Sequence, residues 1–88
     1  MYLHLGNETV VLLSDVVAIL DIETATTEKI TREYLKTAET RLQVTSVSEQ
    51  LPKSVVICND ISGKRVYLSQ ISSKTLQKRC EVFKSDSY

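Results

Sequence analysis

The fold is decided by the stretch SVVICNDISGKRVYLS at residues 54–69. Its first part is a near-continuous apolar run, which is typical of a buried strand. Its last part alternates, so that Val66 and Leu68 point to one side of a strand and their neighbours point to the other. Between the two runs lies Gly63, which is free to take a positive φ. The stretch therefore predicts a β-hairpin.

Three further strand candidates lie upstream of this hairpin. Residues 2–5 and 9–13 flank Gly6-Asn7, a strong turn signal, and together they predict an N-terminal hairpin. In residues 16–22 β-branched side chains dominate, which favours a buried third strand over a helix.

The clearest predicted helix covers residues 24–41. Apolar side chains recur there at four-residue steps and form one stripe: Ile30, Tyr34, Ala38 and Leu42. Thr26 or Thr27 would cap its start. After it, residues 44–51 are polar and β-branched, and they fit either a short edge strand or a loop.

A second helix is predicted from Lys74 to about residue 83. Ser72 or Ser73 would cap it. Its inner stripe is formed by Leu76, Cys80 and Phe83. The predicted order is β-β-β-α-β-β-α, an α+β fold in which two helices cover a small, mostly antiparallel sheet. We expect one domain over residues 1–88.

The length and the charge distribution favour self-association. A chain of 88 residues buries a limited core, and oligomerisation is one ordinary remedy. The formal net charge is zero, but residues 1–44 carry seven acids and four bases, and residues 45–88 the reverse. Such a split suits head-to-tail association or one basic face for an anionic partner. The simpler interpretation is two solvated surfaces.

No pattern in the sequence predicts catalysis, a cofactor or a metal. Cys58 and Cys80 form no C-x-x-C pair and lie far from His4, the sole histidine, so we expect two buried thiols. The isolated glycines form no phosphate-binding loop. The N-terminus has no basic region before an apolar run, and no stretch is long enough to span a membrane, so we expect a cytoplasmic protein.

The basic side chains of the second half are the candidate functional residues. Lysine and arginine hold phosphate backbones and release counterions on binding. The candidate DNA contacts are Lys53, Lys64, Arg65, Lys74, Lys78 and Arg79. One neutral subunit would bind DNA weakly, whereas a row of copies adds weak contacts through effective concentration. The alternative is a surface that only keeps the protein soluble.

Five colinear segments resemble the RemA/RemB family of bacterial extracellular matrix regulators. They are MYLHLG at residues 1–6 with Val10-Val11, DVVAILD at 15–21, PKSVV at 52–56, YLS at 67–69 and ISSKTLQKR at 71–79. The resemblance implies a small regulator tied to biofilm matrix production. It also implies a small sheet with helices, and assembly into ring-like oligomers that bind DNA, as for RemA in this family.

The chain departs from RemA where that protein is associated with DNA contact. An arginine-rich loop before the central strand of RemA matches residues 49–53 here, where only Lys53 is basic, and another arginine falls at Asp15. The leading hypothesis is a non-enzymatic, oligomeric DNA-binding regulator of matrix genes. The alternative is an oligomeric scaffold or protein-binding module without DNA affinity that partners a RemA-like protein.

Overall fold

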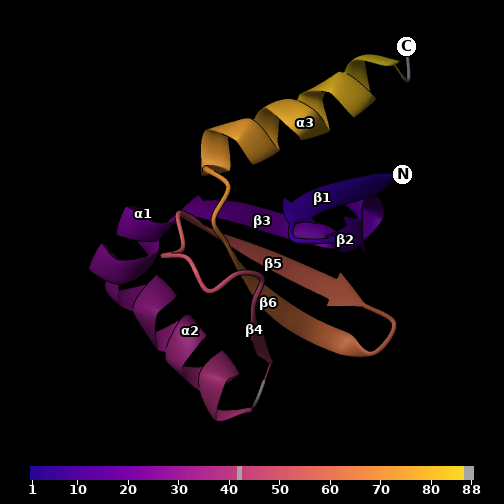
Figure 1. Cartoon of the computed structure of the whole chain (residues 1–88). Helices are drawn as coiled ribbons and strands as arrows, with labels where there is room; N and C mark the ends of the chain where they lie inside the picture. Colours follow the sequence, from indigo (N-terminus) through magenta and orange to yellow (C-terminus); the bar gives the residue numbers. More distant parts are fainter. Residues whose placement is uncertain (42, 87–88) are drawn as a thin grey trace.

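The computed structural model describes the backbone of residues 1–41 and 43–86, and the side chains of residues 1–41 and 43–81. The chain forms the following elements (Figure 1): β1 (Tyr2–Gly6), β2 (Thr9–Leu12), the short 3-10 helix η1 (Leu13–Asp15), β3 (Val16–Asp21), α1 (Ile22–Thr27), α2 (Lys29–Thr40), β4 (Val44–Ser46), β5 (Ser54–Asp60), β6 (Gly63–Ser69) and α3 (Ser73–Asp86). The predicted α+β class is confirmed.

Most strands pair in a four-stranded sheet of order β3-β5-β6-β4. β5 is antiparallel to both β3 and β6, whereas β4 is parallel to β6. β1 and β2 form a separate two-stranded antiparallel sheet. The prediction of mostly antiparallel pairing is therefore confirmed. Residues 44–51 were expected to form an edge strand or a loop, and residues 44–46 form an edge strand.

The central hairpin predicted from residues 54–69 is confirmed. Its strands pair from Ser54 opposite Ser69 to Asp60 opposite Gly63, which leaves a two-residue loop. Gly63 adopts φ +116°. The Asp60 carboxylate accepts a hydrogen bond of 2.8 Å from the Ser62 backbone N–H, which fixes the turn.

The N-terminal hairpin is also confirmed, and its turn is tight. Asn7 and Glu8 occupy the two loop positions with φ of 43° and 66°. Positive φ at both positions is the signature of a type I′ turn, which matches the right-handed twist of the strands. Glu8 takes this conformation although glycine is the preferred residue there.

Two apolar clusters lie on opposite faces of the four-stranded sheet. On one face, the β1–β2 hairpin and α3 pack over β5. The buried members of that cluster are Leu3, Leu5, Val11, Val47, Val56, Cys58 and Leu76. On the other face, α1 and α2 contribute Ala25 and Ala38, which pack against Val55 and Val66. The sheet is thus covered on both faces, which explains the apolar character of β5.

The helix predicted over residues 24–41 is two helices, so the described residues form three α-helices rather than two. Glu28 takes an extended conformation, φ −82° and ψ 125°, and separates α1 from α2. The threonine hydroxyls of α1 bond back to its carbonyls: Thr27 donates to the Glu23 carbonyl at 2.8 Å. Such local bonds and β-branching lower helix propensity, which favours an end at this point.

The predicted cap and stripe of this region need correction as well. Asp21 caps α1, because its carboxylate accepts a hydrogen bond of 3.1 Å from the Glu23 N–H, and neither Thr26 nor Thr27 is a cap. Ile30 is 84% exposed instead of facing the core. Leu42, the last predicted member of the stripe, lies outside the described residues.

The start of the last helix, α3, agrees with the prediction. Ser72 caps α3, because its hydroxyl accepts a hydrogen bond of 3.2 Å from the Thr75 N–H. Leu76 is fully buried, and Cys80 is partly buried against the same cluster. The side chain of Phe83 lies outside the described residues.

Candidate nucleic-acid interface

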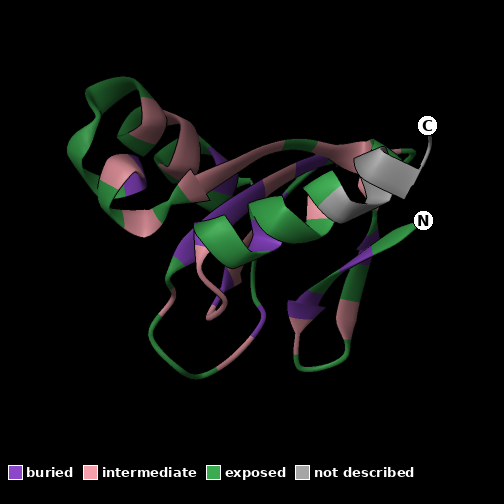
Figure 2. Ribbon diagram, turned by 90° about the horizontal axis from the view of Figure 1, so that it is seen from above, coloured by how far each residue is buried: buried purple, intermediate pink, exposed green. Residues whose placement is uncertain are grey.

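Three of the six candidate DNA contacts lie on α3. Figure 2 looks down on this helix, whose outward surface is mostly exposed. Lys74 and Lys78 are both exposed and stand one helical turn apart. Arg79 is exposed too, but its guanidinium donates a hydrogen bond of 3.0 Å to the backbone carbonyl of His4 on β1. Arg79 therefore ties α3 to the N-terminal hairpin, and Lys74 and Lys78 remain as outward cations among the described side chains of α3.

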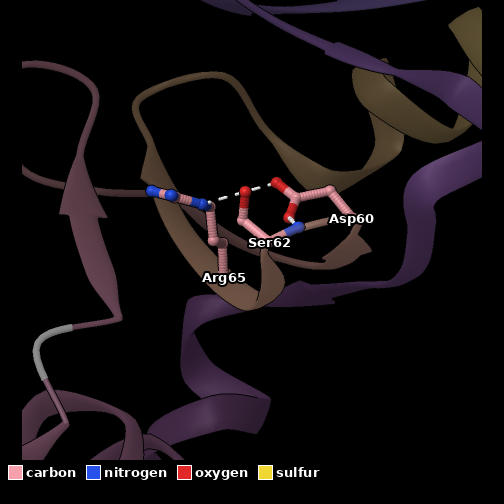
Figure 3. A network of polar contacts seen from close by, with 3 residues as sticks. All are labelled: Asp60, Ser62 and Arg65. Carbon is pink, nitrogen blue, oxygen red and sulfur yellow. Dashed lines mark hydrogen bonds and ion pairs between the residues drawn. The ribbon is translucent and has the colours of Figure 1, made fainter.

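Lys64 and Arg65 lie at the start of β6, next to the turn of the central hairpin. The guanidinium of Arg65 lies 3.4 Å from the carboxylate of Asp60, and Figure 3 shows this ion pair beside the bond between Asp60 and Ser62. Both charges are partly exposed, so the pair adds little stability. The Asp60 carboxylate does partly neutralise the charge of Arg65, and this weakens the attraction of Arg65 for a phosphate.

Lys53 lies at the other end of β5. Its backbone N–H donates to the Ser69 carbonyl at 2.8 Å, and its carbonyl accepts from the Ile22 N–H at 3.1 Å. A strand rises about 3.3 Å per residue, so the length of β5 separates Lys53 from the hairpin turn by roughly 20 Å. Lys53 and Lys64 therefore cannot contact the same phosphate.

The strand register divides the hairpin cations between the two faces of the sheet. Arg65 is opposite Cys58, which belongs to the cluster under α3 and the β1–β2 hairpin. Lys64 is opposite Asn59, one residue further along the strand, so it points to the face that α2 covers. The structure thus places Arg65 and the α3 lysines on one side of the sheet and Lys64 on the other.

A second group of cations, on α2, was not among the predicted DNA contacts, although Arg32 and Lys36 were expected one turn apart on its exposed face. Lys29, Arg32 and Lys36 line one shallow surface pocket with Glu33. Their spacing of three and four residues is the signal that could have revealed a common helix face. Arg41 and Lys64 line a groove between α2 and β6. Basic side chains are therefore distributed over both faces of the molecule.

Two ionisable groups below α3 are shifted toward their neutral forms. Burial, followed by the nearby carboxylates of Asp15 and Asp60, raises the pKa of the Cys58 thiol to about 11. Burial and then the neighbouring Cys58 raise the pKa of Tyr67. Both side chains are therefore neutral at pH 7, and Cys58 is a buried thiol as predicted.

The described part of the chain contains no group of three or more His, Cys, Asp or Glu side chains arranged to hold a metal ion. Within the same residues, no helix is both long and apolar enough to cross a membrane.

The fold and the surface define a small α+β protein with dispersed basic side chains. Residues 2–80 match the family described as RemA-like, extracellular matrix regulatory protein A-like. The chain is also 39% identical over 88 residues to extracellular matrix regulatory protein B of Bacillus subtilis (strain 168). The aligned region covers 99% of this chain and all of that protein. The chain belongs to the RemA-like family of extracellular matrix regulators.

Proposed function

We propose that this member of the family is a non-enzymatic regulator of matrix genes that binds duplex DNA as an oligomer. The observation that carries the proposal is the outward surface of α3. Lys74 and Lys78 are exposed one turn apart there, and neither forms an ion pair with a described side chain. Two such ammonium groups can neutralise two phosphates of one backbone.

Oligomerisation is a necessary part of this proposal. A monomer with formal net charge zero, and with two outward lysines among the described side chains of α3, would bind duplex DNA weakly at physiological salt. Repeated copies that present the same helix to one duplex convert weak contacts into tight binding. A DNA target in a bacterium would also place the protein in the cytoplasm.

The test is fluorescence anisotropy of a labelled duplex in a series of salt concentrations, on protein whose mass is measured by light scattering. We compare the double variant Lys74→Gln and Lys78→Gln with the control Lys29→Gln and Lys36→Gln, which has the same net charge. The α3 variant should lower the affinity and reduce the salt slope by about two for each subunit that contacts the duplex. Wild-type affinity and salt slope in the α3 variant would exclude α3 as the contact.

A second candidate function is an oligomeric scaffold that partners a RemA-like protein and has no DNA affinity. Arg65 is engaged by Asp60 and Arg79 by the His4 carbonyl, which leaves few cations on the α3 side. If an assembled protein ignores duplex DNA at low salt but binds a RemA-like protein in light scattering, this second function replaces the first.

A further inference from the structure

The two edges of the four-stranded sheet differ. At one edge, β4 is only three residues long, and Thr45 and Ser46 on it are exposed. A very short polar edge strand is one way in which proteins prevent unwanted strand pairing. The other edge is β3, which pairs only with β5 among the described residues. β3 has six residues, of which the first five are apolar and none is a lysine or proline.

β3 therefore presents an apolar edge whose protection is limited to one bulge near its start. Val17 is 66% exposed and lies at an irregularity between the pairs made by Val16 and Ala18. A bulge turns its side chain outward and leaves the following residues 18–20 regular. Seen from above, β3 runs along the side of the molecule away from the β1–β2 turn (Figure 2).

A groove of about 360 Å³ runs between this edge and α3. β3 and Leu13 contribute apolar side chains to it, and one flank of α3 contributes Gln77, Cys80 and Glu81. The lining residues are Leu13, Val16, Val17, Ala18, Ile19, Gln77, Cys80 and Glu81. An added strand would hydrogen-bond to β3 with its backbone, and every second side chain would enter the groove.

The charges around the groove indicate which kind of molecule would bind there. Glu81 lines it, and Asp15 immediately precedes β3. At the other end of β3, Asp21 is opposite Ser54, next to the exposed Lys53. The end near Asp15 is therefore the more acidic one, and it would attract a cation and repel a phosphate backbone.

We propose that the β3 edge binds an extended segment of a partner protein by strand addition. The segment has alternating apolar side chains and a lysine or arginine at the end that meets Asp15 and Glu81. Self-pairing of β3 about Ala18 would place Asp15 opposite Asp21 of the second copy, and these like charges disfavour it. The groove uses residues of α3 other than Lys74 and Lys78, so this proposal and DNA binding can fail independently.

The test uses a labelled, capped peptide in which valine and threonine alternate and two lysines stand at one end. Binding is measured by fluorescence anisotropy, and the site by amide chemical shifts. The variant is Val17→Lys, and the matched control is Val10→Lys, which adds the same charge at another exposed valine, on β2. Val17→Lys should weaken binding about tenfold through lost contact and like charge, whereas Val10→Lys should leave binding unchanged.

The contribution of the two lysines at the end of the peptide is tested separately. Glu81→Gln should weaken binding of the lysine peptide, and Glu49→Gln, at an exposed loop position, should not. A peptide with two glutamates in place of the lysines should bind least, and shifts should appear in β3 but not in β4.

Two results would overturn the proposal. One is that the wild-type protein binds neither peptide, or binds both with affinities that Val17→Lys does not change. The other is that Val17→Lys lowers the mass in light scattering while Val10→Lys does not, which would show that a second copy occupies this edge.

Discussion

The side-chain hydroxyl of Ser69 donates a hydrogen bond of 2.7 Å to the backbone carbonyl of Leu5, and both residues are fully buried. The same oxygen accepts a hydrogen bond of 3.0 Å from the Ile71 N–H. One serine therefore connects the end of β6, the start of the β6–α3 connection and the N-terminal hairpin.

Replacing Ser69 by alanine should destabilise the protein. The substitution leaves a buried carbonyl and a partly buried N–H without their partner, which costs about 1–3 kcal/mol for an unsatisfied buried group. Urea unfolding followed by circular dichroism measures the change. The control Ser46→Ala, at an exposed position of β4, should stay within about 0.5 kcal/mol. Equal stabilities of the two variants would contradict a structural role for Ser69.

Glu8→Gly should stabilise the protein. Glu8 holds φ 66° in the β1–β2 turn, a conformation that glycine adopts without strain. The backbone strain that glycine relieves in the folded state exceeds the conformational entropy that it adds to the unfolded chain. We therefore expect the free energy of unfolding to rise by roughly 0.5–1 kcal/mol. Thermal unfolding measures it, with Glu8→Ala as the control that removes the carboxylate but keeps a β-carbon. If Glu8→Ala gives the same gain, charge and not backbone strain is the cause.

Gly6→Ala should have the opposite effect. Gly6 has φ +110°, and an added β-carbon would come within 2.7 Å of the Gln70 side-chain nitrogen. Strain and displacement of this amide should together lower the melting temperature in the same thermal assay. Gly63→Ala is the informative comparison, because Gly63 has a similar φ of +116° and open space around it. A larger loss at Gly63 would contradict the importance of the contact with Gln70.

Cys58 should make stability pH-dependent in alkaline solution. Its pKa is raised from 9.0 to about 11 in the folded state, so between these values the folded protein holds a proton that the unfolded chain has released. Stability contributed by the neutral thiol is therefore complete below pH 9 and is lost as the pH rises toward 11. Urea unfolding at several pH values should show a smaller alkaline loss for Cys58→Ala than for the wild type. Parallel pH profiles would contradict this assignment.

Asp60→Asn should release Arg65 without destroying the hairpin turn. Asparagine can still accept the hydrogen bond from the Ser62 N–H, while the ion pair at 3.4 Å is lost. We expect stability to change by no more than about 0.5 kcal/mol, because the pair is partly exposed. If the protein binds DNA through the α3 side, its affinity should rise in the anisotropy assay. Unchanged DNA affinity would place Arg65 outside the contact.

Much of the fold could be predicted from short-range signals. The apolar and alternating runs around Gly63 and the Gly6-Asn7 turn predicted both hairpins, and Ser72 was among the expected caps of α3. These features depend on local backbone preference and strand periodicity, which a single sequence carries.

Other features depend on contacts that the sequence does not state. The break at Glu28 has neither glycine nor proline to mark it. The parallel pairing of β4 with β6 depends on how α2 returns the chain to the sheet. Ile30 continues a helical stripe, yet α2 begins at Lys29, and the side chain lies beyond the edge of the core.

The sequence predicted which residues belong to the candidate site, but not how they are arranged. Strand alternation implies that Lys64 and Arg65 point to opposite faces, but not which face α3 covers. The pairing of Arg65 with Asp60 and the bond from Arg79 to the His4 carbonyl arise from the folded structure.

The separation of β1 and β2 from the main sheet has a consequence during synthesis on the ribosome. The hairpin emerges before the strands of the main sheet, but two strands alone are marginally stable in water. Its buried side, with Leu3 and Leu5, packs on Leu76, which is translated after all of the strands. We therefore expect this hairpin to dock only after the main sheet and α3 have been made. Amides of β1 in a chain truncated before residue 70 should exchange with deuterium as fast as those of an unfolded peptide.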